Sequence, residues 1–338
     1  MDNKGREAFW NVLMGLHDDS EESMNSLRAA SAWPKQLCRF RSVTEHSLQQ
    51  LNENKMFFSS ANFYDDPFDT YFYTNVKQFM PFYEMMRKAL DDGNVDTINT
   101  LRQLATTVGL NPDVFVSGLF NNSLDFPILQ GKMADVRSFI QKGLYSICFY
   151  EDPYNETLWL KYAANYSGFV QIYDMEDQDT FLCGKEDVCN NCISEKIRPN
   201  IYPVYYSDNI YDATKYAFGV LVLDGIRGQP NPALAALDKY IYSALMWEPE
   251  RISLIKKKCH EYDQEWRMLH PIMSDQRPCI KMKPCKVIIG LRTTDEDSEQ
   301  IIIAAKNAGI KEIHKLFIND ADQLDSQPVP DKQLHTVL

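Results

Sequence analysis

The spacing of hydrophobic positions changes along the chain, and it predicts an opening set of helices and short strands. Phe9, Trp10, Leu13 and Leu16 fall near one helical face, which predicts an N-terminal helical segment. A short apolar run over 37–40 follows, and Ser42 or Thr44 is positioned to cap a helix that carries Leu48 and Leu51. The run over 56–60 is typical of a strand.

Residues 76–144 keep the helical period through three successive apolar stripes. Breaks are predicted at Gly93, at Gly109 with Pro112, and over Phe126–Gly131, because glycine and proline interrupt helices. We therefore predict an insertion of three or four helices. The stripes are Val76, Phe79, Met80, Tyr83 and Met86; Val95, Ile98, Leu101, Ala105 and Val108; and Met133, Val136, Ile140 and Leu144.

The second half changes to the shorter period of strands. A helix is predicted over Pro232–Trp247, and another over Asp297–Ala308 is closed by Gly309 and followed by a strand over Lys311–Ile318. Residues 175–200 are polar and predict a loop. The other predicted strands are Tyr145–Tyr150, Gly168–Tyr173, Ile201–Tyr206, Trp266–Ile272 and Cys285–Leu291.

These elements predict an α+β fold with a mixed sheet core, a helical insertion and a βαβ-like carboxyl end. The N-terminal helical extension covers residues 1–35, and the α+β core covers 36–75 and 143–318. The helical insertion covers 76–142. The polar tail over 319–338, which carries Pro328 and Pro330, is expected to be loose.

Composition and charge narrow the classes of function. In 338 residues, Lys and Arg number 35 and Asp and Glu number 47, giving a formal charge of −12. Because phosphate binding needs a positive field, we expect no global nucleic-acid binding, although a local basic pocket stays open. The chain shows no signal peptide and no apolar run near the ~18 residues of a membrane span. We expect a cytoplasmic protein with no membrane partner.

The cysteines raise the question of a metal. Cys189 and Cys192 form a CxxC pair, with Cys183 close by as a third ligand and His260 or Cys259 as a fourth. A second pair at matching spacing is not obvious in the sequence. We therefore favour a polar loop with free thiols and do not expect zinc. Phosphate-binding glycine loops and the nucleophile-elbow motif are also absent from the sequence.

Four short stretches carry the remaining candidate chemistry. Arg39 and Arg41 alternate on a strand, so both side chains point to one face. A strand with Ser59 and Ser60 enters a turn that carries Asp66 and Asp69. The third stretch is a Cys-Phe-Tyr strand that ends at residue 150 and is followed by a helix. The fourth is a strand that begins after Asp263. The residues that mark these last two stretches are Cys148, Trp159, Tyr162, Glu265, Trp266 and Arg267.

This set, in this order, resembles a bacterial family known as domain of unknown function 2971. Its members carry an arginine-bearing strand, an Asn-Asp-Pro-Phe-Asp turn, a Cys-Phe-Ser strand, a Trp-x-x-Tyr-Ala helix and a Glu-x-Glu-Trp-Arg strand. Here Asp65 replaces the Asn of the turn, Tyr150 replaces the Ser, and Asp263 replaces the first Glu. The resemblance covers about residues 36–75 and 143–318 and implies no established activity.

The same order more remotely resembles ADP-ribosyltransferases, which place an Arg or His first, a Ser, Thr or Tyr second and a catalytic Glu last. That resemblance assigns Arg39, with Arg41 as the alternative, to the first position. Ser59 or Ser60 takes the second and Glu265 the third. An arginine grips the pyrophosphate of NAD in bidentate fashion, and a carboxylate stabilises the positive charge that develops on the ribose.

Under this resemblance Glu265 and Arg39 are the catalytic candidates. The resemblance implies NAD or a related nucleotide as the substrate, and it further implies the role of a toxin or phage-defence effector. The substrate-binding candidates are Arg41, Ser59, Ser60, Asp66, Asp69, Trp159, Tyr162 and Arg267.

Structural interpretations of the same residues stay open. In these interpretations Glu265 pairs with an arginine such as Arg267 or Arg39, and Arg39 and Arg41 are surface residues of an edge strand. The aspartates only build a turn, and Trp159 and Tyr162 belong to the core. The alternative function is a non-enzymatic sensor that binds a nucleotide-like molecule, or a protein through the helical insertion. A third is a zinc-dependent interaction protein.

Overall fold

The computed structural model describes residues 1–78, 88, 91–107, 111–113, 116, 126–177, 181–182, 200–217, 219–220, 245–270 and 278–330. Its α-helices are α1 (Asn3–Gly15), α2 (Glu21–Ala30), α3 (Glu45–Asn52), α5 (Val95–Thr107), α7 (Phe126–Gly143), α8 (Glu156–Tyr162), α12 (Glu248–Ser253) and α13 (Asp295–Asn307). Short 3₁₀ helices lie at η1 (Ala61–Phe63), η2 (Val76–Gln78) and η4 (Lys258–Asp263).

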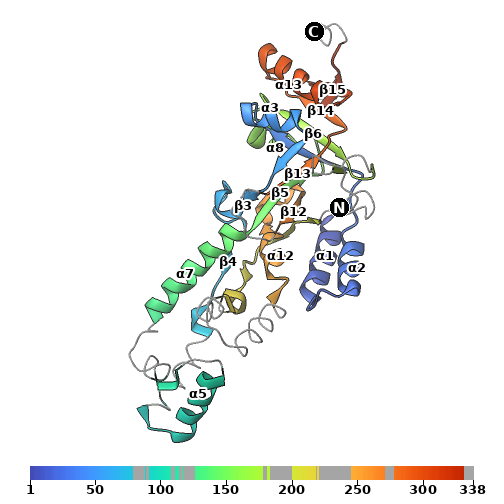
Figure 1. Cartoon of the computed structure of the whole chain (residues 1–338). Coiled ribbons are helices and arrows are strands. Elements are labelled where there is room, and N and C mark those ends of the chain that lie inside the picture. The colour runs from blue at the N-terminus through green and yellow to red at the C-terminus, as the bar shows by residue number, and fades with distance from the viewer. Residues whose placement is uncertain are drawn as a thin grey trace.

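A nine-stranded mixed sheet forms the centre of the molecule (Figure 1), so the fold is α+β as predicted. Its order is β16-β15-β14-β6-β1-β5-β12-β8, and β3 pairs with β5 beside that path. Only β14 and β15 run parallel in it. The strands are β1 (Gln36–Arg41), β3 (Ser59–Ser60), β5 (Tyr145–Tyr150), β6 (Phe169–Asp174), β8 (Ile201–Pro203), β12 (Glu265–His270), β14 (Lys286–Ile289), β15 (Glu312–Ile318) and β16 (Leu324–Pro328).

Three smaller sheets surround it. They pair β10 (Tyr211–Asp212) with β4 (Phe72–Tyr73), β11 (Ile255–Lys257) with β9 (Tyr205–Ser207), and β13 (Cys279–Met282) with both β2 (Lys55–Phe57) and β7 (Phe181–Leu182). Two predicted strands are thus divided between sheets. The run over 56–60 gives β2 and β3, and the run over 201–206 gives β8 and β9, because the chain changes sheets at Phe58 and Val204.

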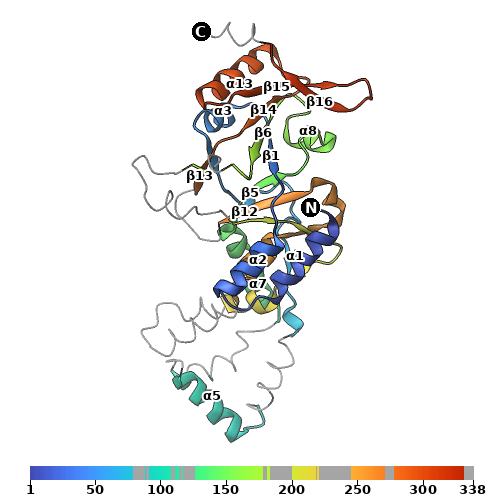
Figure 2. The ribbon, with the colours of Figure 1, turned by 90° about the vertical axis from the view of Figure 1, so that its right-hand side faces the viewer.

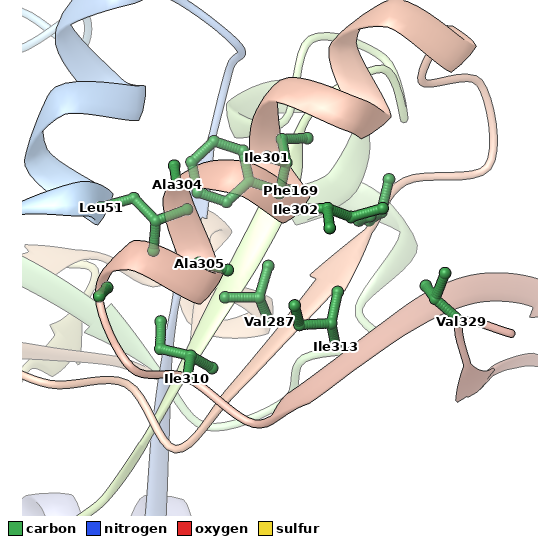
Figure 3. Close-up of a cluster of buried hydrophobic side chains, with 12 residues drawn as sticks. Leu51, Phe169, Val287, Ile301, Ile302, Ala304, Ala305, Ile310, Ile313 and Val329 are labelled. Carbon is green, nitrogen blue, oxygen red and sulfur yellow. The ribbon is translucent and has the colours of Figure 1, made fainter. Parts of the chain in front are cut away.

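The carboxyl end forms the predicted βαβ unit, with α13 as the crossover between the parallel strands β14 and β15. Thr294 caps α13, and Gly309 follows it at φ +74°, a conformation that glycine adopts without strain. Figure 3 shows the apolar face of α13 lying on the sheet, with Leu51 of α3 closing one side. Burial of this cluster fixes the helix to the sheet.

The two N-terminal helices pack against the lower part of the sheet (Figure 2). Phe9 and Leu13 are fully buried against a cluster that includes Tyr202 and Trp247, so the predicted apolar face of α1 is confirmed. Arg6 is also buried, and its guanidinium donates to the carbonyl oxygens of Val204 and Glu265 at 2.9 and 2.7 Å. The extension therefore supports the strand that carries Glu265.

Within 76–142 the described residues form helices and turns, and none of them joins a sheet. Figure 1 shows α7 and α5 running away from the central sheet, toward the end opposite α13. The apolar stripe of α7 packs Met133, Val136 and Ile140 against Phe72 of β4. Within the described residues, the predicted helices over 95–108 and 133–144 are confirmed as α5 and α7.

The structure corrects two boundaries. The break predicted over Phe126–Gly131 is wrong, because α7 begins at Phe126 and Pro127 stands in its first turn, where no intrahelical donor is needed. The prediction of a loose tail is also wrong for Leu324–Pro328, which form the edge strand β16 against β15. An edge strand tolerates polar residues and a proline, so its sequence resembles a tail. The helix predicted over 232–247 and most of the loop over 175–200 lie outside the described residues.

Gly168 marks the closest approach between β1 and the loop that leads into β6. A Cβ atom at Gly168 would lie 2.1 Å from the carbonyl oxygen of Arg41, a backbone atom that cannot move aside cheaply. We expect Gly168→Ala to lower the free energy of unfolding by about 1–3 kcal/mol, measured by urea denaturation. Gly15→Ala is the control, because nothing lies within 4 Å of its Cβ position. Equal stability of the two variants would contradict the steric constraint.

Candidate functional site

A gap in the central sheet opens into a cavity lined by residues of β1, β3 and β5. One edge of β5 pairs with β1 only at Tyr150, opposite Cys38, and with β3 only at Ser146 and Tyr145. Among the described residues, no strand therefore pairs with residues 147–149 of β5 on that edge. The cavity that lies there has a volume of about 700 Å³, which is the size of a small-molecule site.

Side chains from both faces of the sheet line the cavity at this gap. Cys38, Tyr150 and Glu265 are register partners, so they project to one face. Arg39 and Arg41 alternate to the other face, where the Arg39 guanidinium lies 5.9 Å from the centre of the Phe149 ring. The two catalytic candidates therefore do not face each other across one surface, although Arg39 and Glu265 both line the cavity.

Glu265 belongs to a buried network of ion pairs. Its Oε1 accepts from Arg267 Nε at 2.6 Å, and its Oε2 accepts from Lys256 Nζ at 2.9 Å. Arg267 Nη2 also binds Asp69 Oδ2 at 2.6 Å, and Lys256 Nζ binds Asp263 Oδ2 at 2.9 Å. The network joins the loop after η1, strand β11, η4 and strand β12.

These contacts favour the charged forms of Glu265 and Lys256. Burial alone would raise the pKa of Glu265, but Arg267 and Lys256 outweigh it and hold that pKa well below its usual range. Burial alone would lower the pKa of Lys256, and the carboxylates of Glu265 and Asp69 raise it instead. The stability that Glu265 contributes is therefore present at neutral pH and is lost only as the pH falls through its lowered folded pKa.

Most of the predicted site residues meet at this cavity. His260 Nε2 lies 3.0 Å from Asp66 Oδ2, and Tyr162 stacks on Tyr150 with ring centres 5.6 Å apart. Asp66 and Asp69 also build the turn, since Asp66 accepts from the backbone of Phe68 and of Asp69. The predicted residues that line the cavity are Arg39, Arg41, Ser59, Asp66, Asp69, Tyr162 and Glu265.

Three predicted binding residues do not line it. Trp159 is fully buried, packs edge-on against Phe40 and donates to the carbonyl of Pro153, so it belongs to the core. The Ser60 hydroxyl donates to the carbonyl of Lys142 at 3.1 Å and ties η1 to the end of α7. Arg267 is fully buried behind Glu265 and Asp69, where it positions both carboxylates.

Sequence reasoning missed other residues of the cavity wall. Lys256 lies on a three-residue strand with no motif around it, so nothing local marked it. Tyr64 shares a hydrogen bond with Ser146, and both stand beside motif residues without belonging to a recognisable pattern. Lys161, next to Tyr162, donates to the Tyr262 hydroxyl at 3.1 Å. For Tyr64, Ser146 and Lys161, the only signal in the sequence was that each lies close to a motif residue.

The cavity is also lined by the thiol of Cys148. Burial raises the pKa of Cys148 to about 12, so it stays protonated at neutral pH and is a poor nucleophile. For the metal alternative, Cys183, Cys189 and Cys192 lie outside the described residues. Cys259 is exposed, and His260 is committed to Asp66. Within the described ranges no cluster of three or more His, Cys, Asp or Glu residues could hold a metal.

A scan against protein-family models finds no match for this chain, and searches of curated proteins and solved structures find none either. The resemblances to the domain of unknown function 2971 and to ADP-ribosyltransferases therefore stay predictions. In the part of the chain that the structure describes, no helix has both the length and the apolar character to cross a bilayer.

The buried network predicts a large difference between two arginines. Arg267→Met would leave the buried carboxylates of Asp69 and Glu265 without their shared partner, and we expect a loss of about 3–5 kcal/mol of unfolding free energy. Arg102→Met is the matched control, because its ion pair with Asp113 is exposed and is worth about 0–1 kcal/mol. Chemical denaturation of both variants measures the difference. Similar losses would show that the network is not the stabilising contact inferred here.

Proposed function

We propose that this chain binds a nucleotide or a closely related phosphorylated small molecule in the cavity between β1 and β5. The observation that carries the proposal is the meeting of Arg39 and Arg41 with carboxylates and tyrosines around one space of about 700 Å³. Arginines suit the phosphates of a nucleotide, carboxylates suit the hydroxyl groups of its sugar, and tyrosine rings suit its base.

The two arginines support the phosphate end of such a ligand. They stand on β1, where the backbone at both positions is paired with β6, opposite Gln171 and Phe169, and the other edge faces the gap. Among the described residues no carboxylate lies within ion-pair distance of Arg39. A guanidinium group without a competing carboxylate is suited to bind phosphate oxygens in bidentate geometry.

The opposite wall supports the remainder of the ligand. The stacked Tyr150 and Tyr162 offer an aromatic surface, and Lys161 stands next to them. Asp66 and Asp69 add hydrogen-bond acceptors from the loop after η1. Acceptors of this kind suit the hydroxyl groups of a sugar, and aromatic rings suit a planar base.

The proposal predicts that Arg39 contributes to the binding of phosphate groups. Titration calorimetry with ADP, and separately with inorganic pyrophosphate, should give an affinity about 10- to 100-fold weaker for Arg39→Gln, since charged hydrogen bonds are lost. Arg292→Gln is the control, because that exposed arginine contacts Asn165 outside the cavity. Absence of binding to the unmodified chain, or equal binding to Arg39→Gln, would sink the proposed function.

A second candidate function is cleavage of the glycosidic bond of NAD, as the resemblance to ADP-ribosyltransferases implies. The observation that favours it is that Glu265 lines the cavity with a carboxylate held ionised, the state that stabilises positive charge on a ribose. Its weakness is that both oxygens of Glu265 already bind cations.

Paired assays on Glu265→Gln separate catalysis from a structural role. If the chain cleaves NAD, nicotinamide release by the variant should fall about 10²- to 10³-fold, because the stabilising charge is lost. Thermal melting of the same variant measures the structural cost of leaving Lys256 and Arg267 with a neutral partner. An unmodified chain that binds ADP but releases no nicotinamide, with a variant that melts early, would favour binding without turnover.

A further inference from the structure

Lys161 brings to the cavity an ammonium group that no described carboxylate neutralises. The residue is exposed and lines the cavity, so a ligand can reach its side chain. Its Nζ donates to the Tyr262 hydroxyl at 3.1 Å, and no carboxylate of the described residues lies within ion-pair distance of it. An ammonium group has three donors, so this one contact leaves two of them for an anion.

Aromatic rings and η4 fix the position of this ammonium group. Lys161 Nζ lies 5.4 Å from the centre of the Tyr162 ring and 5.6 Å from the centre of the Tyr262 ring. Tyr162 lines the cavity and stacks on Tyr150, which lines it too. Asn155 Nδ2 donates to the carbonyl of Tyr262 at 2.9 Å and so ties η4 to the start of α8. The cation is placed before a ligand arrives, which limits the entropy lost on binding.

Lys161 approaches the cavity from the face of the sheet opposite to the two arginines. Phe40 packs edge-on against Trp159 of α8 with ring centres 5.5 Å apart, so α8 covers the face to which Phe40 points. Arg39 and Arg41 alternate with Phe40 along β1 and therefore point to the other face. The cavity thus has cations on both sides of the gap in the sheet.

Two separate cationic positions suit two separate anionic groups on one ligand. AMP and ADP carry all of their phosphates on the 5′ side of the ribose, so a nucleotide of this kind that binds Arg39 and Arg41 has no anion left for Lys161. A nucleoside with a second phosphate on the 3′ side has an anion at each end of the ribose. Lysine binds such a phosphate as a point charge, whereas arginine binds it in bidentate geometry.

We propose that Lys161 binds a second phosphate, and that the ligand is a nucleoside bisphosphate with phosphates on both the 5′ and the 3′ side of the ribose. This inference rests on the proposed function, because it assigns the far end of the ligand whose 5′ phosphate lies at Arg39 and Arg41. It makes α8 the element that distinguishes such a ligand from AMP.

The test compares AMP with adenosine 3′,5′-bisphosphate, and AMP with ADP, by titration calorimetry. On the unmodified chain we expect the 3′ phosphate to strengthen binding about 5- to 20-fold, because it adds a charged hydrogen bond at an exposed lysine. Lys161→Met should remove most of that gain and keep the gain from the second 5′ phosphate of ADP. Lys4→Met is the matched control, because Lys4 is an exposed lysine on α1, outside the cavity.

Tyr262→Phe is a second variant, since it removes only the hydroxyl group that accepts from Lys161 Nζ. It should reduce the gain from the 3′ phosphate in the same direction as Lys161→Met, because the ammonium group is then less well positioned. Thermal melting of each variant identifies any loss of folding.

The outcomes separate this inference from the proposed function. If AMP and the bisphosphate bind the unmodified chain equally, or if the gain persists in Lys161→Met, the assignment of Lys161 is overturned while the nucleotide site stands. If none of the three nucleotides binds and pyrophosphate does not bind either, both proposals fail. If Lys161→Met does not fold, the unmodified chain and Tyr262→Phe still decide the question.

Discussion

The rest of the site depends on the ion pairs that Arg267 forms with two carboxylates from different parts of the chain. One is Glu265, two residues earlier on the same strand, and the other is Asp69, from a loop far away in sequence. Because all three side chains are buried, none of them can exchange its partner for water without a large cost in free energy. The loop after η1 is thereby fixed to β12, and it becomes one wall of the cavity.

The second constraint is the incomplete pairing of β5. A strand in the middle of a sheet normally has partners along both edges, but β1 contacts this edge of β5 at one end and β3 contacts it at the other. The unpaired stretch leaves space that side chains from both faces reach. This explains how Arg39 and Glu265 border one cavity although their strands direct them to opposite faces.

Together these constraints limit the chemistry of Glu265. A carboxylate that neutralises Lys256 and Arg267 has little negative charge left for a substrate. The interpretation of Glu265 as the ion-pair partner of Arg267, left open by the sequence, agrees with the distances around it.

The sequence by itself determined the local elements. Strict helical spacing marked α1, α5 and the second half of α7, and apolar runs marked β5, β6, β14 and β15 together with the helix between the last two. These features follow from periods of 3.6 and 2 residues, which are properties of short segments. The same local signals failed at β16 and at the start of α7, because an edge strand and a first helical turn tolerate residues that elsewhere indicate a loop.

Only the tertiary structure decided which candidate residues share a site. The motifs marked Arg39, Asp69 and Glu265, and the sequence left a core position open for Trp159, which the structure confirms. Nothing in the sequence indicated that Lys256 completes the network. Side chains meet according to strand order and register, and these depend on pairings between distant segments. Burial then sets the charge state of each group, since the same carboxylate is a surface anion in water and a fixed ion-pair partner between Arg267 and Lys256.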